Sequence, residues 1–351
     1  MPLEFRRTIQ SASFLDPRNN FEPTTLSFEM RVDPLTGHTG TVYEYRYVKL
    51  EKPDLSEVVA KSLRAGCPAC PEFIEKVTPK FPPEIAPEGR LHLGEACVFP
   101  NIAPYTPYSA VTVLSKKHFI ALTEFTEETL VNGFLASQAY LKRVLAHDPE
   151  AKYCEIDWNY MPLSGAGLFH PHFQVLARYS SGRYHGELLE ASRGYRQRNG
   201  SNFWRDFIAK EKELGERYIG AIGDTFWLTC FVSRGWMLDA IAVFEGKDSV
   251  LSLSQRDFAD LSQGLLKVFN YMDDQDLHSF CFTIYSGLQG DDSLWTQARI
   301  VPRFTLPPMG ANDSSYLRVL YDEFCSLKLP EAACKELKGY FAGSDQGSNL
   351  D

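Results

Sequence analysis

The sequence lacks any stretch that could cross a membrane. Its most apolar segment, residues 226–244, contains Arg234 and Asp239, whereas a membrane-spanning helix needs about 20 nearly uncharged residues. The first ten residues, MPLEFRRTIQ, have no apolar core after their arginine pair, so the pattern of a secretory signal is missing as well. We therefore expect a cytoplasmic protein with no membrane partner.

Positive charge and chain-breaking residues are also scarce. The 36 Lys and Arg residues stand against 45 Asp and Glu residues, which gives a formal net charge of −9 at pH 7. Nucleic-acid-binding surfaces need a basic stripe, so we expect no nucleic-acid partner, although a local basic pocket for phosphates is compatible with this balance. With 24 Gly and 21 Pro in 351 residues, the composition excludes collagen and long disorder. The length accommodates two domains or one large domain.

Closely spaced cysteines are rare. Of the eight cysteines, only Cys67 and Cys70 form a close pair. In a reducing compartment, a C-x-x-C pair indicates a metal site or redox chemistry rather than a structural disulfide. Zinc takes four ligands, usually Cys and His. His118 and His170 are candidates for the other two ligands, but spacing alone does not select them.

The chain does contain a weak internal repeat. Segments 111–130 and 241–261 both run from an apolar strand through a polar turn into a helix, and Thr123 and Ser254 are the expected N-caps of these helices. A pair of strands is expected after each helix, at 154–163 and 169–178 in the first copy and at 279–286 and 294–303 in the second. This order predicts two α+β units that share one sheet.

The densest group of chemically active residues is the segment FHPHFQ, which begins at Phe169. Alternate side chains of a strand share a face, so His170, His172 and Gln174 should point one way and the phenylalanines should point to the core. A solvated sheet face usually carries Lys, Glu and Thr. Two of the eight histidines of the chain on such a face therefore indicate a functional site.

Together, the His-Pro-His-x-Gln motif, the preceding C-x-x-C pair and the tandem repeat resemble the galactose-1-phosphate uridylyltransferase branch of the histidine-triad superfamily. Three further segments fit this resemblance. RVDPLTG at 31–37 looks like the opening strand and turn of the family, and VFPN at 98–101 looks like its strand that ends in a nucleotide-contacting Asn. Asn159 lies eleven residues before His170, as another family Asn does. The specific motifs cover residues 28–180, whereas 219–326 match by topology.

The resemblance implies an α+β fold of tandem duplicated histidine-triad-like units, with an antiparallel sheet and flanking helices. Residues 1–200 would form the N-terminal unit with the catalytic motif and a zinc site. Residues 201–351 would form a degenerate C-terminal unit.

The resemblance also assigns roles to individual residues. His172 would be the nucleophile, with the proton on its other ring nitrogen held by a backbone carbonyl near Asn159, and Gln174 would bind a phosphate oxygen. Nucleotide and phosphate contacts are expected from Arg46, Lys49, Asn101 and Asn159. One structural zinc ion per chain would be held by Cys67, Cys70, His118 and His170, which leave no open position for water.

The activity implied is nucleotidyl transfer from a nucleotide-sugar to a sugar 1-phosphate through a covalent nucleotidyl-histidine, as in the UDP-glucose–hexose-1-phosphate uridylyltransferases of galactose metabolism. A homodimer is one option, because some family members are dimers. One alternative is a phosphorylase or adenylyltransferase that uses phosphate or sulfate as the acceptor, including phosphorylases of dinucleoside polyphosphates or of nucleotide-sugars. The other is a non-catalytic nucleotide-binding protein. A thiol redox protein would leave the histidines unexplained.

The sequence departs from the family pattern in two places. The Ser or Asn that precedes His-Pro-His in the family is absent, and residues 165–168 read GAGL, with Ser164 as a substitute. Some family members bind a second metal through a Glu and three His, but the second half offers only His278. Its counterpart strand carries Trp295, Gln297 and Arg299 instead, and we expect this half to be catalytically silent. We expect His185 and Glu187 to be polar loop residues.

Overall fold

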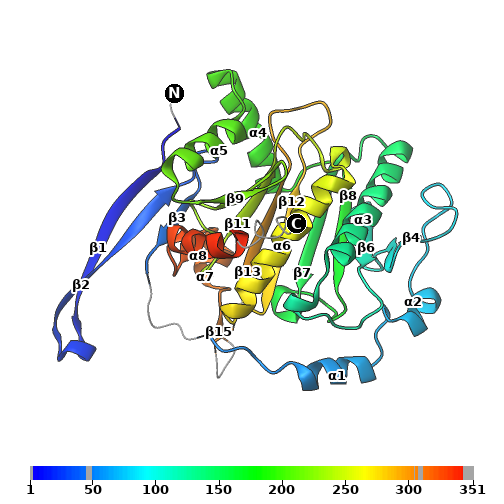
Figure 1. The fold of residues 1–351 in the computed structure, drawn as a ribbon, viewed down its shortest axis with the longest axis horizontal. Coiled ribbons are helices and arrows are strands. Elements are labelled where there is room, and N and C mark those ends of the chain that lie inside the picture. Colours follow the sequence, from blue (N-terminus) through cyan, green and yellow to red (C-terminus); the bar gives the residue numbers. More distant parts are fainter. Residues whose placement is uncertain (1–2, 45–49, 304, 307–310, 343–351) are drawn as a thin grey trace, which may run out of the picture.

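A ten-stranded antiparallel sheet forms the centre of the computed structural model, which describes residues 3–44, 50–303, 305–306 and 311–342 (Figure 1). From one edge to the other, its strands are β4 (Leu91–Leu93), β5 (Ala96–Pro100), β6 (Tyr108–Val113), β8 (His172–Arg178), β7 (Tyr153–Tyr160), β12 (Ser279–Tyr285), β13 (Gln297–Arg303), β11 (Ala240–Phe244), β10 (Thr225–Thr229) and β9 (Tyr218–Ile222).

The sheet consists of two copies of one five-stranded unit that meet at the β7–β12 pair. The order β4-β5-β6-β8-β7 of the first half is repeated in reverse as β12-β13-β11-β10-β9. At the junction, Asp157 pairs with Thr283. The predicted duplication of α+β units on one sheet is thus confirmed, whereas the boundary at residue 200 stays a prediction.

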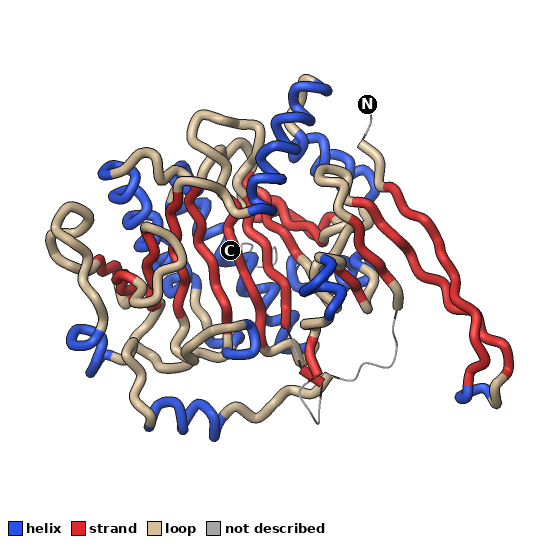
Figure 2. The backbone as a smooth tube through the Cα atoms, turned by 180° about the vertical axis from the view of Figure 1, so that it is seen from behind, coloured by secondary structure: helices blue, strands red, loops and turns tan. Residues whose placement is uncertain are grey.

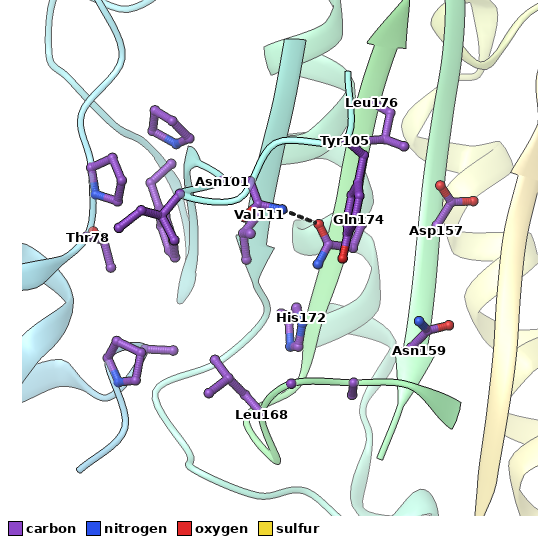
Figure 3. A pocket seen from close by; sticks show the side chains of 18 of the residues that line it. Thr78, Asn101, Tyr105, Val111, Asp157, Asn159, Leu168, His172, Gln174 and Leu176 are labelled. Atoms are coloured by element: carbon purple, nitrogen blue, oxygen red, sulfur yellow. Dashed lines mark hydrogen bonds between the residues drawn. The ribbon is translucent and has the colours of Figure 1, made fainter. Parts of the chain in front are cut away.

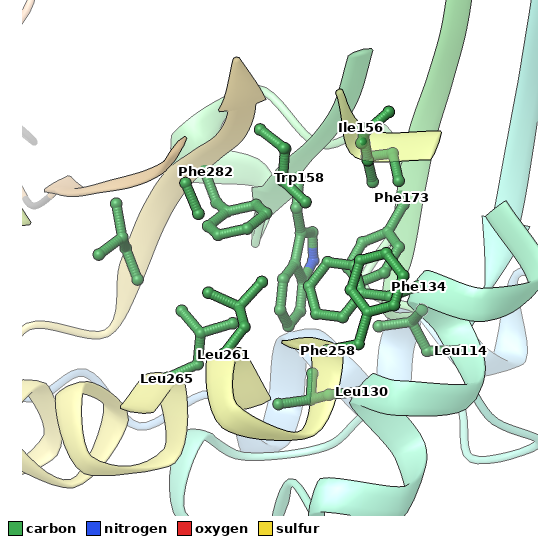
Figure 4. Close-up of a cluster of buried hydrophobic side chains, with 14 of the residues drawn as sticks. Leu114, Leu130, Phe134, Ile156, Trp158, Phe173, Phe258, Leu261, Leu265 and Phe282 are labelled. Atoms are coloured by element: carbon green, nitrogen blue, oxygen red, sulfur yellow. The ribbon is translucent and has the colours of Figure 1, made fainter. Parts of the chain in front are cut away.

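Two long helices cover one face of this sheet. Helix α3 (Glu127–His147) belongs to the first unit and α6 (Gln255–Asp274) to the second, and they pack side by side (Figure 1). Between them and the sheet lies an aromatic core, in which Phe134 stacks on Phe173 at 4.8 Å and on Phe258 at 5.4 Å between ring centroids (Figure 4). Trp158 is fully buried beside them. The other face of the first half carries loops (Figure 2), and this leaves room for a site.

The starts of two predicted elements differ from the expectation. Ser254 caps α6 as predicted, but the cap of α3 is Thr126 rather than Thr123. Thr123 lies in a short 3₁₀ turn, Leu122–Glu124, which delays the helix. Strand β8 begins at His172 and not at 169, because Pro171 has no N–H to donate to a ladder. His170 therefore precedes the strand.

The remaining elements surround this sheet. A second sheet has the order β1 (Arg6–Asp16), β2 (Glu22–Val32), β3 (Thr39–Val42) and β16 (Phe324–Ser326), and its β1–β2 hairpin projects from the molecule (Figures 1 and 2). The other elements are α1 (Ser56–Arg64), α2 (Pro71–Val77), α4 (Arg183–Asn199), α5 (Phe203–Leu214), α7 (Tyr316–Tyr321), α8 (Pro330–Ala342), β14 (Thr305–Leu306), β15 (Ala311–Asn312) and 3₁₀ turns at Pro17–Asn19, Pro162–Ser164 and Val250–Ser252. Within the described residues, no helix has the length and apolar composition to cross a bilayer.

The contact between α6 and the sheet makes a prediction about Gly264. A Cβ atom at Gly264 would overlap the indole ring of the buried Trp227, whereas a Cβ at Gly339, on the exposed side of α8, would meet nothing within 4 Å. Gly264→Ala should lower the free energy of unfolding by about 1–3 kcal/mol because of overpacking. Gly339→Ala should raise it by about 0.5–1 kcal/mol because alanine favours helices. Denaturant unfolding measures both, and equal stabilities would contradict this packing.

Candidate active site

A cavity of about 670 Å³ lies on the loop-bearing face of the first half (Figure 3). Strands β7 and β8 form its floor. Its walls come from the C-x-x-C loop, the end of α2, the segment that follows β5 and the turn before β8. The side chains on the floor are Asp157, Asn159, His172, Gln174 and Leu176, and the wall residues include Ala69, Val77, Thr78, Pro79, Phe99, Asn101, Ile102, Tyr105 and the segment 165–168.

His172 presents an unprotonated ring nitrogen to this cavity. Its Nδ1 lies 2.7 Å from the carbonyl oxygen of His170. A carbonyl can only accept a hydrogen bond, so Nδ1 carries the proton and Nε2 keeps its lone pair. Burial lowers the pKa of His172, which also favours the neutral ring. The predicted carbonyl partner near Asn159 is wrong, because the turn at Pro171 brings the carbonyl of His170 back to the ring.

Gln174 is oriented by a chain of hydrogen bonds that begins at Asn101. The backbone N–H of Ala103 donates to Asn101 Oδ1 at 3.0 Å, so the Asn101 amide must use Nδ2 as its donor. That Nδ2 donates to Gln174 Oε1 at 3.0 Å (Figure 3). The Nε2 donors of Gln174 are consequently left for a ligand in the cavity, as a phosphate oxygen would require.

The turn before β8 completes the nucleophile's end of the cavity. Gly165 has a φ of +95°, a conformation that favours glycine, and residues 165–168 line the cavity together with Asn159. Ser164 is not the substitute donor that the sequence indicated. Its buried hydroxyl is hydrogen-bonded to Ser279, and it does not line the cavity. Of the other predicted phosphate contacts, Arg46 and Lys49 lie outside the described residues.

Four predicted metal ligands converge behind His172. Their ligand atoms all lie within 4.8 Å of one another. Nδ1 of His170 is 3.7 Å from Cys67 Sγ and 3.8 Å from Cys70 Sγ, and Nδ1 of His118 is 3.4 Å from Cys70 Sγ. Tetrahedral zinc with ordinary bond lengths separates a sulfur and a nitrogen ligand by about 3.6 Å. The spacing of the four side chains therefore fits a zinc ion.

The neighbours of both histidines leave Nδ1 available for the metal. Nε2 of His170 donates to the carbonyl oxygen of Ser115 at 2.7 Å. Nε2 of His118 lies 2.7 Å from Ser62 Oγ, whose own proton goes to the carbonyl of Val59. Burial lowers the pKa of His118 and lowers that of His170 to about 4. Both rings are thus neutral with Nδ1 free, as metal ligation requires.

A second group of metal-ligand types, Glu75, His92 and Cys97, lies nearer the surface. Its geometry is looser, with 4.0 Å between Cys97 Sγ and His92 Nε2, and Glu75 already pairs with Arg90 at 2.9 Å. Within the described part of the chain, both groups belong to the first half.

The equivalent face of the second half is covered. Helices α4 and α5 pack Leu188, Phe203 and Phe207 against Ile241 and other apolar residues of the sheet. A void of only about 30 Å³ remains beside Gln297 and Arg299. These two residues occupy the positions on β13 that His172 and Gln174 occupy on β8.

Several polar residues on this covered face have partners within the protein. Arg299 donates to both carboxylate oxygens of Asp239. His185 and Glu187 lie on α4 and not in a loop as predicted. Nε2 of His185 contacts the carbonyl oxygen of Ser286 at 2.6 Å, and Glu187 contacts His38 at 2.7 Å.

Sequence reasoning missed the acidic residue on the cavity floor, Asp157, and the wall residues Thr78 and Tyr105. The most notable of these is Asp157. It lies two positions before Asn159 on β7 and therefore on the same face. The alternation of side chains that placed His172 and Gln174 on one face also places Asp157 and Asn159 on one face of the preceding strand, so this signal was present in the sequence.

Comparisons with known proteins agree with this fold. No family model matches the sequence. An uncharacterised protein of Archaeoglobus fulgidus is 30% identical over 338 residues, which are 96% of this chain and 98% of that protein.

Similar solved structures share the architecture at low sequence identity. A GalT-like protein from Arabidopsis thaliana has a TM-score of 0.68 at 14% identity, covering 88% of this chain and 98% of that one. An ADP-glucose phosphorylase from the same plant, with bound ADP-glucose, has a TM-score of 0.66 at 14% identity over 89% and 98% of the chains. A uridylyltransferase has a TM-score of 0.66 at 15% identity over 90% and 99%. The resemblance is confirmed at the level of the fold.

The four-ligand cluster predicts one zinc ion per chain in protein purified without chelators. Cys67→Ser should lower the zinc content and the unfolding temperature together, because ligation is coupled to folding. Cys325→Ser changes a half-buried thiol on β16 that is not one of the four predicted ligands, and it should retain the metal. Elemental analysis that finds no metal in the wild-type protein would show the zinc site to be wrong.

Proposed function

This chain belongs to one family with the Archaeoglobus fulgidus protein and has the fold of the galactose-1-phosphate uridylyltransferase-like branch of the histidine-triad superfamily, and on that basis we propose that it is a nucleotidyltransferase. The observation that carries this proposal is the Nε2 lone pair of His172 in a cavity of nucleotide size. A neutral imidazole attacks phosphorus well and leaves again afterwards, so one displacement is divided into two easier ones.

In the first step, Nε2 of His172 forms a bond to the α-phosphorus of a nucleotide-sugar. The bond between that phosphorus and the bridging oxygen breaks, and the sugar phosphate leaves with the electron pair. In the second step, an acceptor oxygen attacks the same phosphorus and Nε2 departs. The proton stays on Nδ1 throughout and is donated to the carbonyl oxygen of His170. This hydrogen bond also stabilises the positive charge on the ring while Nε2 carries the nucleotidyl group.

The surroundings of His172 supply positioning and charge stabilisation. The Nε2 group of Gln174, turned to the cavity by Asn101, would donate to a non-bridging phosphate oxygen. Backbone N–H groups of the 165–168 turn and the side chain of Asn159 would also donate hydrogen bonds to phosphate oxygens, from the end of the cavity next to His172. Apolar side chains of the opposite wall, such as Val77 and Phe99, suit a base. Arg46 and Lys49 stay proposed phosphate contacts.

Zinc has a structural part in this proposal. Cys67, Cys70, His118 and His170 would hold the ion, and with four protein ligands it has no position for water or substrate. His170 is at once a ligand through Nδ1 and, through its carbonyl, the partner of His172. The bound ion would thereby fix the residue that sets the tautomer of the nucleophile.

The acceptor is the finer part of the proposal. Transfer to a sugar 1-phosphate, as in a UDP-glucose–hexose-1-phosphate uridylyltransferase of galactose metabolism, is the first candidate. Transfer to inorganic phosphate is the second, and it is supported by the likeness of the fold to a phosphorylase solved with bound ADP-glucose. Both candidates use the same first step, so one assay tests them together.

The covalent step predicts exchange of label between a nucleoside diphosphate-sugar and its sugar phosphate when no second acceptor is present. The donors to try are UDP-glucose, ADP-glucose, GDP-sugars and ATP. His172→Gly should lower the rate of exchange by a factor on the order of 10⁴ or more, with little change in nucleotide affinity. Added imidazole should restore part of the rate. If zinc-replete wild-type protein shows no exchange with any donor, a binding protein becomes the better explanation.

The second half supplies the matched control for this experiment. Gln297 occupies the position equivalent to His172 but lies beside a void of about 30 Å³ and has no nucleophilic nitrogen. Gln297→Ala should therefore retain measurable exchange, and acid-labile label on the wild-type protein should map to the peptide that contains His172. A labelled peptide from residues 280–305 would contradict this assignment.

A further inference from the structure

Asp157 is an acid on the cavity floor that the proposed reaction steps do not use. It lies directly opposite Gln174 on β8 and opposite Thr283 on β12, so it projects to the same side of the sheet as the nucleophile. It is partly exposed, and it lines the cavity. Figure 3 shows it across the cavity from Thr78.

Among the described residues, no basic side chain forms an ion pair with this carboxyl group, which is hydrogen-bonded to the side chain of Thr283. The nearby Arg178 pairs with Glu155, whose other oxygen faces His185 at 3.5 Å. Burial, and then the charge of Glu155, raise the pKa of Asp157 to about 7. An amide or an apolar side chain would avoid this cost of burying a charge. An acid kept at such a position, in a cavity with a nucleophile, is a candidate for ligand binding.

The chemistry of the ligand group follows from charge and distance. A carboxylate repels phosphate, so the part of the substrate that meets Asp157 must bring hydrogen-bond donors. Residues directly opposite in an antiparallel pair have Cα atoms about 5 Å apart, so Asp157 is a close neighbour of the amide that would bind phosphate. The hydroxyl groups of a sugar attached to that phosphate come within this reach, whereas a base lies beyond the ribose.

We propose that Asp157 determines substrate specificity by accepting hydrogen bonds from two neighbouring hydroxyl groups of a sugar in the donor molecule whose phosphate binds at Gln174. Two carboxylate oxygens match two adjacent hydroxyls. This proposal rests on the proposed nucleotidyl transfer. Both the hexose, which leaves with the sugar phosphate, and the ribose carry such a pair. The position of Asp157 away from the apolar wall favours the hexose.

The test compares Asp157→Asn with the wild type in formation of the nucleotidyl-enzyme. With ADP-glucose and UDP-glucose as probes, the variant should lose about 10- to 100-fold in kcat/KM, mostly through KM, as loss of a hydrogen bond to a charged group does. ATP and UTP carry ribose but no hexose. If Asp157→Asn has the same kcat/KM as the wild type with ATP and UTP, the hexose is the group that Asp157 binds. If the variant loses as much kcat/KM with ATP and UTP as with the nucleotide-sugars, and this difference from the wild type disappears with the 2′-deoxynucleotides, the ribose is that group.

Two controls separate this effect from loss of folding. Asp157→Asn should unfold at the same temperature as the wild type or higher, because the amide removes a buried charge. Asp260→Asn makes the same change at an acid on α6, on the other face of the sheet, whose pKa is likewise raised by burial. It should leave all constants unchanged.

Two different results would overturn the proposal. If the wild type is active and Asp157→Asn has the same constants with every donor, the role of Asp157 is wrong and the proposed function stands. If the wild type forms no nucleotidyl-enzyme with any donor, the proposed function fails and the role of Asp157 fails with it.

Discussion

The site depends on the alternation of side chains along β8, because this strand must serve a core and a cavity at the same time. Phe173 and Val175 are fully buried on the helix side of the sheet. His172 and Gln174, which alternate with them along the strand, point to the cavity on the other side. A slip of one residue in the ladder would exchange the two sets. The register is held by β6 and β7 on both sides, and His170, one of the four candidate metal ligands, lies directly before the strand.

Much of this could be predicted from the sequence, since it follows from local periodicity. Alternation placed His172 and Gln174 on one face, and helical spacing with a cap placed α6. His170 was predicted to share that face, but Pro171 ends the ladder before it, so its side chain joins Cys67, Cys70 and His118 instead. Its position as a ligand came from the family resemblance. The carbonyl partner of His172 could not be predicted, because a backbone contact within a turn has no side-chain signature.

The sequence indicated a silent second half from the residues on its counterpart strand, but the covering of its sheet face was beyond sequence reasoning. Both halves keep the same strand order and the same helix on one face, so periodicity treats them alike. The two halves differ in the segment of α4 and α5. It packs Phe203 and Phe207 against the sheet of the second half, whereas the same face of the first half carries the cavity. Where this segment packs is decided by tertiary contacts, because it covers the apolar sheet face that is left exposed. An arginine locked to Asp239 then occupies the position of Gln174.

The unbroken ladder between the halves has a consequence for motion. Strands β7 and β12 pair over six successive positions, from Tyr160 and Phe280 to Glu155 and Tyr285. A hinge between the halves would have to break these hydrogen bonds, so the sheet acts as one rigid plate under the cavity. In the proposed reaction, entry of substrate and release of product would then depend on the segments around the rim, such as 101–105 and 165–168. Movement of these short segments, and not of the sheet, would then limit the rate of turnover.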